Sequence, residues 1–360
     1  MTGKPDTWST DIIMEDTAPP LSTVRETAAS PRLKVDELRR FRTYLSEGER
    51  AELFRRYHEP RPLVALWQVV QSWALVFAGW AAVVYVSPLW LPLALVLVGS
   101  RQRALGNTLH DAAHGNMFTG RRTNRGVATL LFGPCIFEDF EAYRLSHLRH
   151  HAYLGDPEGD PDFLPPPRDA DARVVRSPWR FYRHFLFNGA LWRKSVLGEL
   201  PRLSGAQRLR VVLWWAVLLT VLGVLGGARA ALSFAAVWML ARATVYHAIK
   251  VFAEISDHVG LEPGGIVGYT RNLPSNGLAF FLHPHHDNYH LTHHIFPRIP
   301  LANLAHIHRM LEPLPEYSAA NHCHGYFLGP TAVVKSWTTP AFNAARPPDA
   351  SAPVPPERVA

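Results

Sequence analysis

Three short histidine clusters constrain the fold of this 360-residue chain more than any other feature. They read HDAAH at 110–114, HLRHH at 147–151 and HLTHH at 290–294. In a helix, side chains three or four positions apart lie on one face, so each cluster can direct its imidazoles at one point. Neutral imidazole binds iron, zinc and copper, and eight such side chains exceed the needs of one ion. The clusters therefore predict helices that meet at a site for more than one metal ion.

Long apolar segments separate the clusters. Residues 63–87 are almost free of charge and are long enough to cross a hydrocarbon core about 30 Å thick. Residues 211–226 and 231–248 flank a short turn, as in a membrane hairpin. A further span is expected at 89–108, although it contains two arginines. We therefore expect an all-α membrane protein with two transmembrane helical hairpins, about four spans, and a helical cap that holds the metal site.

The distribution of charge predicts the orientation. The net charge is +7, and most arginines lie before the first hairpin, between the two hairpins and at the start of the second. Cytoplasmic segments of membrane proteins are rich in Lys and Arg, so these segments and all three clusters are expected on the cytoplasmic side. No run of Lys and Arg interleaved with aromatic residues suggests a nucleic-acid surface. The basic composition therefore favours a multi-pass membrane protein whose metal site faces the cytoplasm.

The expected membrane domain covers residues 33–330. Residues 1–32 are expected to be a disordered lead-in, and 331–360 a Pro/Ala-rich tail. With only two cysteines, the chain has neither a disulfide framework nor a cysteine-based zinc or iron–sulfur site.

Several metal functions fit the clusters poorly. Histidines of transporters lie within spans, whereas the apolar spans here hold none of the eight. Haem needs one or two histidines, and a structural zinc site closes with four ligands. An open, all-nitrogen dinuclear iron site that binds oxygen fits the clusters best. A non-catalytic metal-binding or transport protein is the remote alternative.

The chain resembles a known family. The order of an apolar hairpin, HDAAHGNMF, SHLRHHAYLGDPEGDPDF, a second hairpin and NYHLTHHIFP is similar to that of the membrane fatty acid desaturase superfamily, which includes hydroxylases. The resemblance covers most of residues 60–310. The segment AEISDHVGLEPG and the last cluster resemble a bacterial branch that includes dihydrorhizobitoxine desaturase. The resemblance implies a four-helix stem, a cytoplasmic cap and a diiron centre that uses O2 and two electrons.

The resemblance also implies the metal ligands. The cluster histidines that match the family are His110, His114, His147, His150, His151, His290, His293 and His294. The family commonly adds a ninth in an Asn-x-x-x-His pattern, which His258 fits with Glu254 in place of the asparagine. Glu254 is expected to orient a ligand, with direct ligation and a local charge role as alternatives. Asp111, His286 and Asp287 are further candidates for orienting or binding roles.

The expected reaction is O2-dependent insertion of a C=C bond into an acyl chain, held as a lipid or thioester. The alternatives are hydroxylation, or desaturation of a small amino-acid-derived metabolite. The chain has no haem, flavin, dinucleotide or ferredoxin motif that could supply electrons. The family precedent implies a separate ferredoxin, rubredoxin or b-type cytochrome with its reductase, and a membrane lipid as the other partner.

Overall fold

The computed structural model describes residues 31–339, and these are mostly helical, as the sequence predicts. The predicted lead-in and tail therefore lie largely outside the described residues, although 331–339 include a short helix. The α-helices are α1 (Pro31–Leu45), α2 (Arg50–Tyr57), α3 (Pro62–Ala81), α4 (Leu91–Ala113), α5 (Arg121–Val127), α6 (Gly133–Cys135), α7 (Phe140–Tyr153), α8 (Pro178–Leu186), α9 (Gly189–Leu197), α10 (Gly205–Ala241), α11 (His247–Asp257), α12 (Ile266–Tyr269), α13 (Ala279–Leu282), α14 (His290–Ile295), α15 (Leu304–Leu311), α16 (Pro315–Ser318) and α17 (Val333–Ser336). Short π-helical and 3₁₀ segments join them: η3 (Ala82–Val86), η4 (Pro88–Trp90), η5 (Ala128–Phe132), η6 (Leu200–Arg202), η7 (Arg242–Tyr246), η8 (Pro284–His286) and η9 (Leu301–Asn303).

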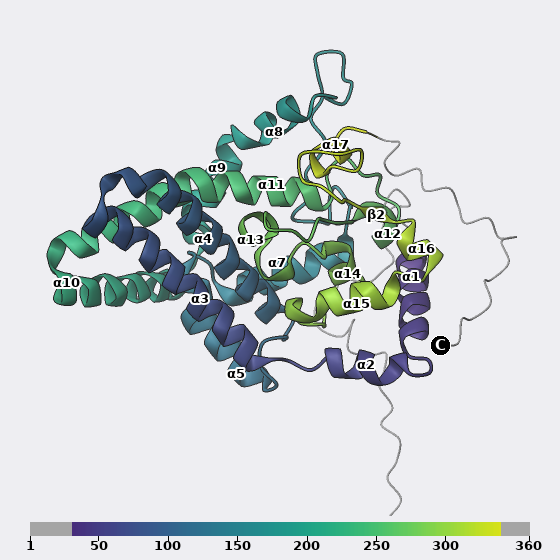
Figure 1. Ribbon diagram of the computed structural model, residues 1–360, viewed down its shortest axis with the longest axis horizontal. Coiled ribbons are helices and arrows are strands. Elements are labelled where there is room, and N and C mark those ends of the chain that lie inside the picture. The colour runs from purple at the N-terminus through teal and green to yellow at the C-terminus, as the bar shows by residue number, and fades with distance from the viewer. Residues whose placement is uncertain (1–30, 340–360) are drawn as a thin grey trace, which may run out of the picture.

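The first hairpin is formed by α3 and α4, which pack side by side. Pro62 occupies the first turn of α3, where its missing N–H costs nothing. The chain reverses at Ser87, whose extended backbone ends η3 and whose hydroxyl accepts a hydrogen bond from the Leu89 amide at 3.3 Å. The α3–α4 hairpin projects from one end of the molecule (Figure 1).

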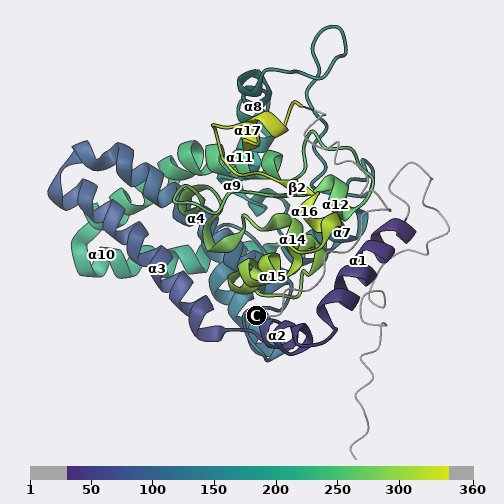
Figure 2. The same ribbon diagram turned by 45° about the vertical axis from the view of Figure 1, so that its right-hand side comes forward.

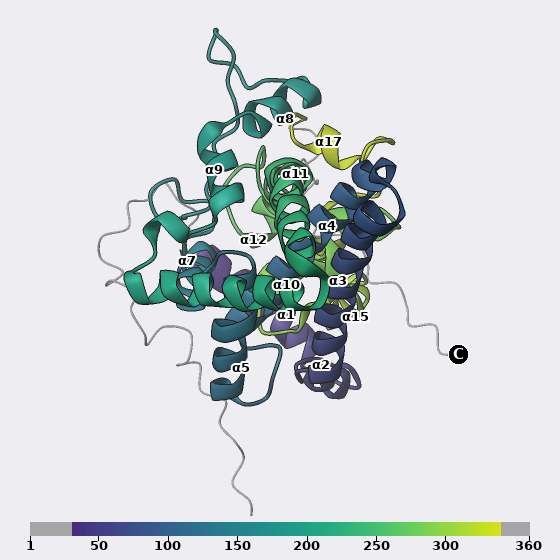
Figure 3. The same ribbon diagram turned by 90° about the vertical axis from the view of Figure 1, so that its left-hand side faces the viewer.

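The second hairpin lies within α10. Gly227 has a φ of +76°, which L residues rarely adopt, and it breaks the helix into two limbs. The indole rings of Trp215 and Trp238, one on each limb, lie 5.2 Å apart, so the limbs pack against each other. The predicted span 211–226 falls on the first limb, and 231–248 covers the second limb and continues through η7 into the start of α11. Figures 1 and 3 show α10 folding back beside α3 and α4.

Two segments of the described chain are long and apolar enough to cross a membrane, Pro62–Val86 and Gly205–Asp257. The second contains both limbs of α10, so the number of spans stays a prediction. Helix α4 is less apolar than these two segments, because its second half carries polar side chains. These side chains are buried inside the protein. Gln102 donates to the carbonyl of Trp238 at 2.9 Å, and Asn107 donates to that of Pro284 at 2.8 Å. These bonds tie α4 to both the second hairpin and the segment before α14.

The remaining elements gather at the other end of the molecule, where α1, α7, α12, α14 and α15 lie close together (Figure 2). An apolar core joins them, and it includes Phe41 of α1, Leu291 of α14 and Leu304 of α15. A short parallel pair of strands, β1 (Arg271–Asn272) and β2 (Asn321–His322), also lies in this part of the molecule. The histidine clusters lie between the hairpins and this core.

Candidate metal centre

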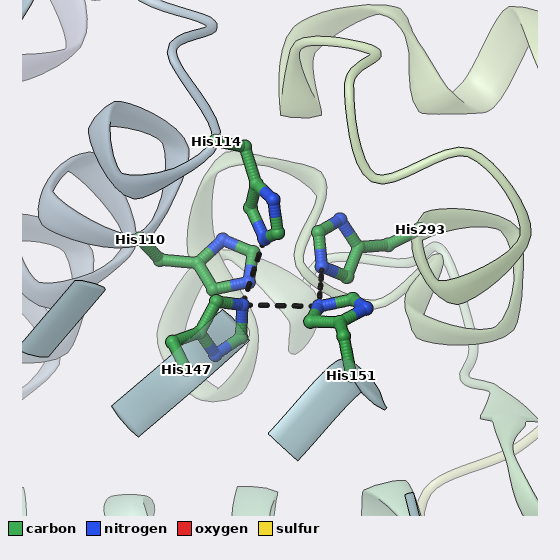
Figure 4. Close-up of side chains that lie close together, drawn as sticks. All are labelled: His110, His114, His147, His151 and His293. Carbon is green, nitrogen blue, oxygen red and sulfur yellow. Dashed lines mark hydrogen bonds between the residues drawn. The ribbon is translucent and has the colours of Figure 1, made fainter. Parts of the chain in front are cut away.

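The structure brings all nine predicted histidines together in two groups. Within each group, the candidate ligand nitrogens lie within 4.8 Å of one another. The first group, drawn in Figure 4, contains His110, His114, His147, His151 and His293. The second group contains His150, His258, His290 and His294. The rings of His151 and His294 stack with centroids 4.3 Å apart, so the two groups adjoin.

Each cluster reaches the centre from a different helix. His110 lies in the last turn of α4, and His114 caps the end of that helix. Helix α7 starts where Asp139 accepts a hydrogen bond from the Ala142 amide at 3.1 Å, which is a standard N-cap. Along α7 the spacing of 147, 150 and 151 divides the three imidazoles between the two groups. Helix α14 divides its three in the same way, and His258 follows the end of α11.

The imidazoles face one another through their Nε2 atoms. In the first group, Nε2 of His147 lies 2.8 Å from that of His114 and 3.1 Å from that of His151. In the second, Nε2 of His290 lies 3.0 Å from that of His258 and 3.1 Å from that of His294. Imidazole nitrogens bound at about 2.0–2.1 Å to one ion lie roughly 3 Å apart. The spacing therefore fits shared coordination in both groups.

Two histidines are oriented by hydrogen bonds at their other nitrogen. Nδ1 of His150 donates to a carboxylate oxygen of Asp160 at 2.8 Å. Nδ1 of His258 donates to the carbonyl of Tyr269 at 2.9 Å. Each bond places the ring hydrogen on Nδ1 and leaves the lone pair of Nε2 directed into its group. This is the tautomer that a metal ligand requires.

Burial favours the uncharged form of His147 and His258. Burial, followed by the neighbouring charge of His150, lowers the pKa of both His147 and His258 to about 3. At neutral pH these side chains are uncharged, which is the form that binds metal. Among residues 31–339, neither ring nitrogen of His110 has a hydrogen-bond partner, although the side chain is buried. An unpaired buried imidazole is costly, and a bound cation would satisfy it. Each group could therefore hold a metal ion.

The four other predicted site residues lie outside both groups. Glu254 pairs with Lys250, one turn earlier on α11. Asp111 accepts hydrogen bonds from the Asn116 side chain at 3.0 Å and the Leu301 amide at 3.3 Å. Burial raises the pKa of Asp111 to about 7.

Asp287 is buried and bonded to Arg103 of α4, with 2.6 Å between carboxylate and guanidinium. His286 is exposed, with a φ of +68°. Asp111 and Asp287 thus tie the histidine-bearing segments to other elements. The two groups consist of histidines, and the buried carboxylate of Asp257 lies 3.8 Å from Nε2 of His290 at the edge of the second group.

Asp160 is a site residue that the sequence reading missed. The sequence alone assigns it no role, yet its carboxylate is buried against His150. The signal was present in GDPEGDPDF, which follows the second cluster directly and contains several acidic residues. Tyr269 orients His258 through its backbone carbonyl, so the residue type gave no indication of this role in the sequence.

Comparisons with known proteins agree with this geometry. The family model described as fatty acid desaturase matches residues 88–326. Dihydrorhizobitoxine desaturase of Bradyrhizobium elkanii is 29% identical over 273 residues, which cover 68% of this chain and 75% of that protein.

Plant enzymes are also similar. A chloroplastic omega-6 fatty acid desaturase of Brassica napus is 25% identical over 62% of this chain and 54% of its own length. A chloroplastic omega-3 fatty acid desaturase of Brassica napus is 26% identical over 70% and 69% of the two chains. These relatives support both the expected superfamily and its bacterial branch, and this chain, an oxidoreductase of the desaturase type, belongs to the fatty acid desaturase family.

Proposed function

We propose that this protein is an O2-dependent diiron desaturase. The observation that carries the proposal is the pair of imidazole groups, each with ligand nitrogens within 4.8 Å of one another. The first group would hold one iron through His110, His114, His147, His151 and His293, and the second would hold the other through His150, His258, His290 and His294. Nitrogen-only coordination of this kind suits iron, and family membership favours iron over zinc or copper.

The reaction converts a single bond between two carbons into a double bond. One hydrogen leaves each carbon, and O2, two electrons and two protons end as two molecules of water. Bound iron supplies the oxidising power for removing hydrogen from an unactivated carbon. The protein's own part is to hold the imidazoles neutral and oriented, through burial and through the hydrogen bonds to Asp160 and Tyr269. The electrons would come from a ferredoxin, rubredoxin or b-type cytochrome with its reductase.

Two substrate classes have support. The similarity to plant omega-6 and omega-3 fatty acid desaturases supports an acyl chain in a lipid or thioester. The similarity to dihydrorhizobitoxine desaturase supports a small amino-acid-derived metabolite. The apolar hairpins support a multi-pass protein of a bacterial plasma membrane, and the positive-inside rule supports a cytoplasmic metal centre.

The two-group arrangement can be tested with one variant from each group. We expect His293→Ala and His150→Ala each to lose about one of two bound irons per chain and all desaturation, because each removes a ligand from a different ion. The protein is purified in detergent, its iron is measured by mass spectrometry, and turnover is assayed with a reductase and ferredoxin. Retained turnover in either variant, or zinc alone in the wild type, would overturn the proposal.

A further inference from the structure

An ion pair lies directly beside the metal centre on the loop that follows α7. Asp160 of this loop accepts the hydrogen bond of His150, and the same carboxylate accepts the amide of Asp162 at 2.9 Å. Asp162 in turn pairs with Lys194 of α9 at 3.6 Å. The side chains of Lys194 and Asp162 are 39% and 44% exposed, so solutes can reach them. A continuous series of contacts thus joins a reachable ion pair to a candidate iron ligand.

A second ion pair stands on the neighbouring helix. Helix α9 packs against α11, and on α11 Lys250 pairs with Glu254 one turn before His258. From α7, the ring of Tyr143 stacks on the imidazole of His147 with centroids 5.8 Å apart. The metal centre is therefore bordered on this side by an aromatic hydroxyl and by charges of both signs.

These groups are close enough to influence one another. Although burial lowers the pKa of Lys194, the carboxylates of Asp162, Glu254 and Glu138 raise it overall. Although burial raises the pKa of Asp162, the neighbouring ammonium group of Lys194 lowers it overall. Both members of the pair are therefore ionised at neutral pH.

We propose that Lys194, Lys250, Asp162 and Glu254 bind the carboxylate and ammonium groups of a small zwitterionic substrate of the amino-acid type. The proposal rests on the proposed desaturase function and selects between its two substrate classes. The lysines face the substrate carboxylate and the acidic side chains face its ammonium, while Tyr143 stacks on His147 at the metal centre. The charged end of the substrate then lies only a few bonds from the carbons that react.

Simple energetics favour such a substrate over a methylene chain. The partly exposed Lys194–Asp162 pair is screened by solvent and contributes little stability, so exchanging it for a pair with a ligand costs little. A methylene chain in the same place would remove water from four charged side chains and give no hydrogen bond in return. Desolvation of a charged group without compensation is unfavourable. An acyl chain would therefore have to approach the metal centre from another side.

The test measures binding, so it does not depend on turnover or bound iron. The full-length protein in detergent is titrated by calorimetry with L-norleucine, hexanoate and hexylamine. These probes share a six-carbon skeleton but carry both charges, only the carboxylate or only the ammonium. We expect L-norleucine to bind at least about tenfold more tightly than either single-charge probe. Equal binding of all three, or no binding of L-norleucine, overturns the proposal.

Variants test whether L-norleucine binds at the proposed residues. Lys194→Met and Asp162→Asn should each weaken L-norleucine binding about tenfold, whereas Lys194→Arg should retain it. Arg193→Gln is the matched control, because it removes a charge from the exposed neighbouring position of α9. Unchanged thermal unfolding confirms that each variant is folded. Unweakened binding in both Lys194→Met and Asp162→Asn overturns the proposal. Since iron content and desaturation are measured separately, failure here leaves the diiron desaturase proposal standing.

Discussion

At the scale of single residues, the metal centre depends on side chains that hold the imidazoles as much as on the imidazoles themselves. Asp160 is buried, and its carboxylate accepts the His150 ring as well as the amides of Gly155 and Asp162. These bonds fix both the ring orientation of His150 and the path of the loop. Partners of this kind usually change metal affinity without touching the metal.

We expect Asp160→Asn to lower iron affinity about 10- to 100-fold, because the amide can still accept a hydrogen bond but lacks the negative charge that strengthens the ligand. Iron retained during dialysis against a graded series of chelator concentrations measures the effect. Glu158→Gln is the matched control, since it makes the same chemical change at an exposed position of the same loop. Equal iron retention in both variants would contradict the role of Asp160.

For Glu254, in contrast to Asp160, we expect no contribution to iron binding. Its carboxylate pairs with Lys250 and lies outside both imidazole groups. We expect Glu254→Gln to bind as much iron as the wild type, measured per chain in purified protein. A loss of about one iron per chain would instead show direct ligation.

At the scale of elements, α4 connects the first hairpin to the rest of the protein. Gly99 lies where α4 meets η7, and a Cβ atom there would lie 2.7 Å from the Tyr246 backbone nitrogen. Glycine is needed at this point because the two helices approach each other at backbone distance. The contact fixes the direction in which α4 carries His110 and His114 to the metal centre.

We expect Gly99→Ala to destabilise the protein by roughly 1–3 kcal/mol, as overpacking of a close helix contact does. Gly106→Ala is the control on the same helix, because nothing lies within 4 Å of its added Cβ. That change should be neutral or slightly stabilising, since alanine favours helix. Thermal unfolding in detergent compares the two variants, and an equal Tm for both would contradict the close-contact argument.

At the scale of the whole molecule, the two hairpins project from one end, and the histidine-bearing segments lie toward the other (Figure 1). Gly227 breaks α10 between its two limbs and so forms the turn at the tip of the second hairpin. The positive-inside rule predicts that this tip and the metal centre face opposite sides of the membrane. Both native cysteines are buried, so introduced thiols can report the orientation.

We expect Ala228→Cys, at the hairpin tip, to react with a membrane-impermeant maleimide in intact cells. Ala170→Cys, at an exposed position of the loop between α7 and α8, should react only after permeabilisation. The wild-type protein gives the background. The reverse pattern would overturn the proposed orientation, and labelling of both in intact cells would overturn a topology in which the membrane separates them.

The sequence by itself determined the helical class, the family and the set of histidines, because helical spacing and long apolar runs are local patterns. The tertiary structure decided how the nine imidazoles divide into two groups, since neighbours such as His150 and His151 belong to different groups. It also showed Asp160 at the metal centre and moved His286 to the surface, for which local spacing gives no reason. Orientation, burial and pairing depend on contacts between segments far apart in the chain, and those exist only once the chain has folded.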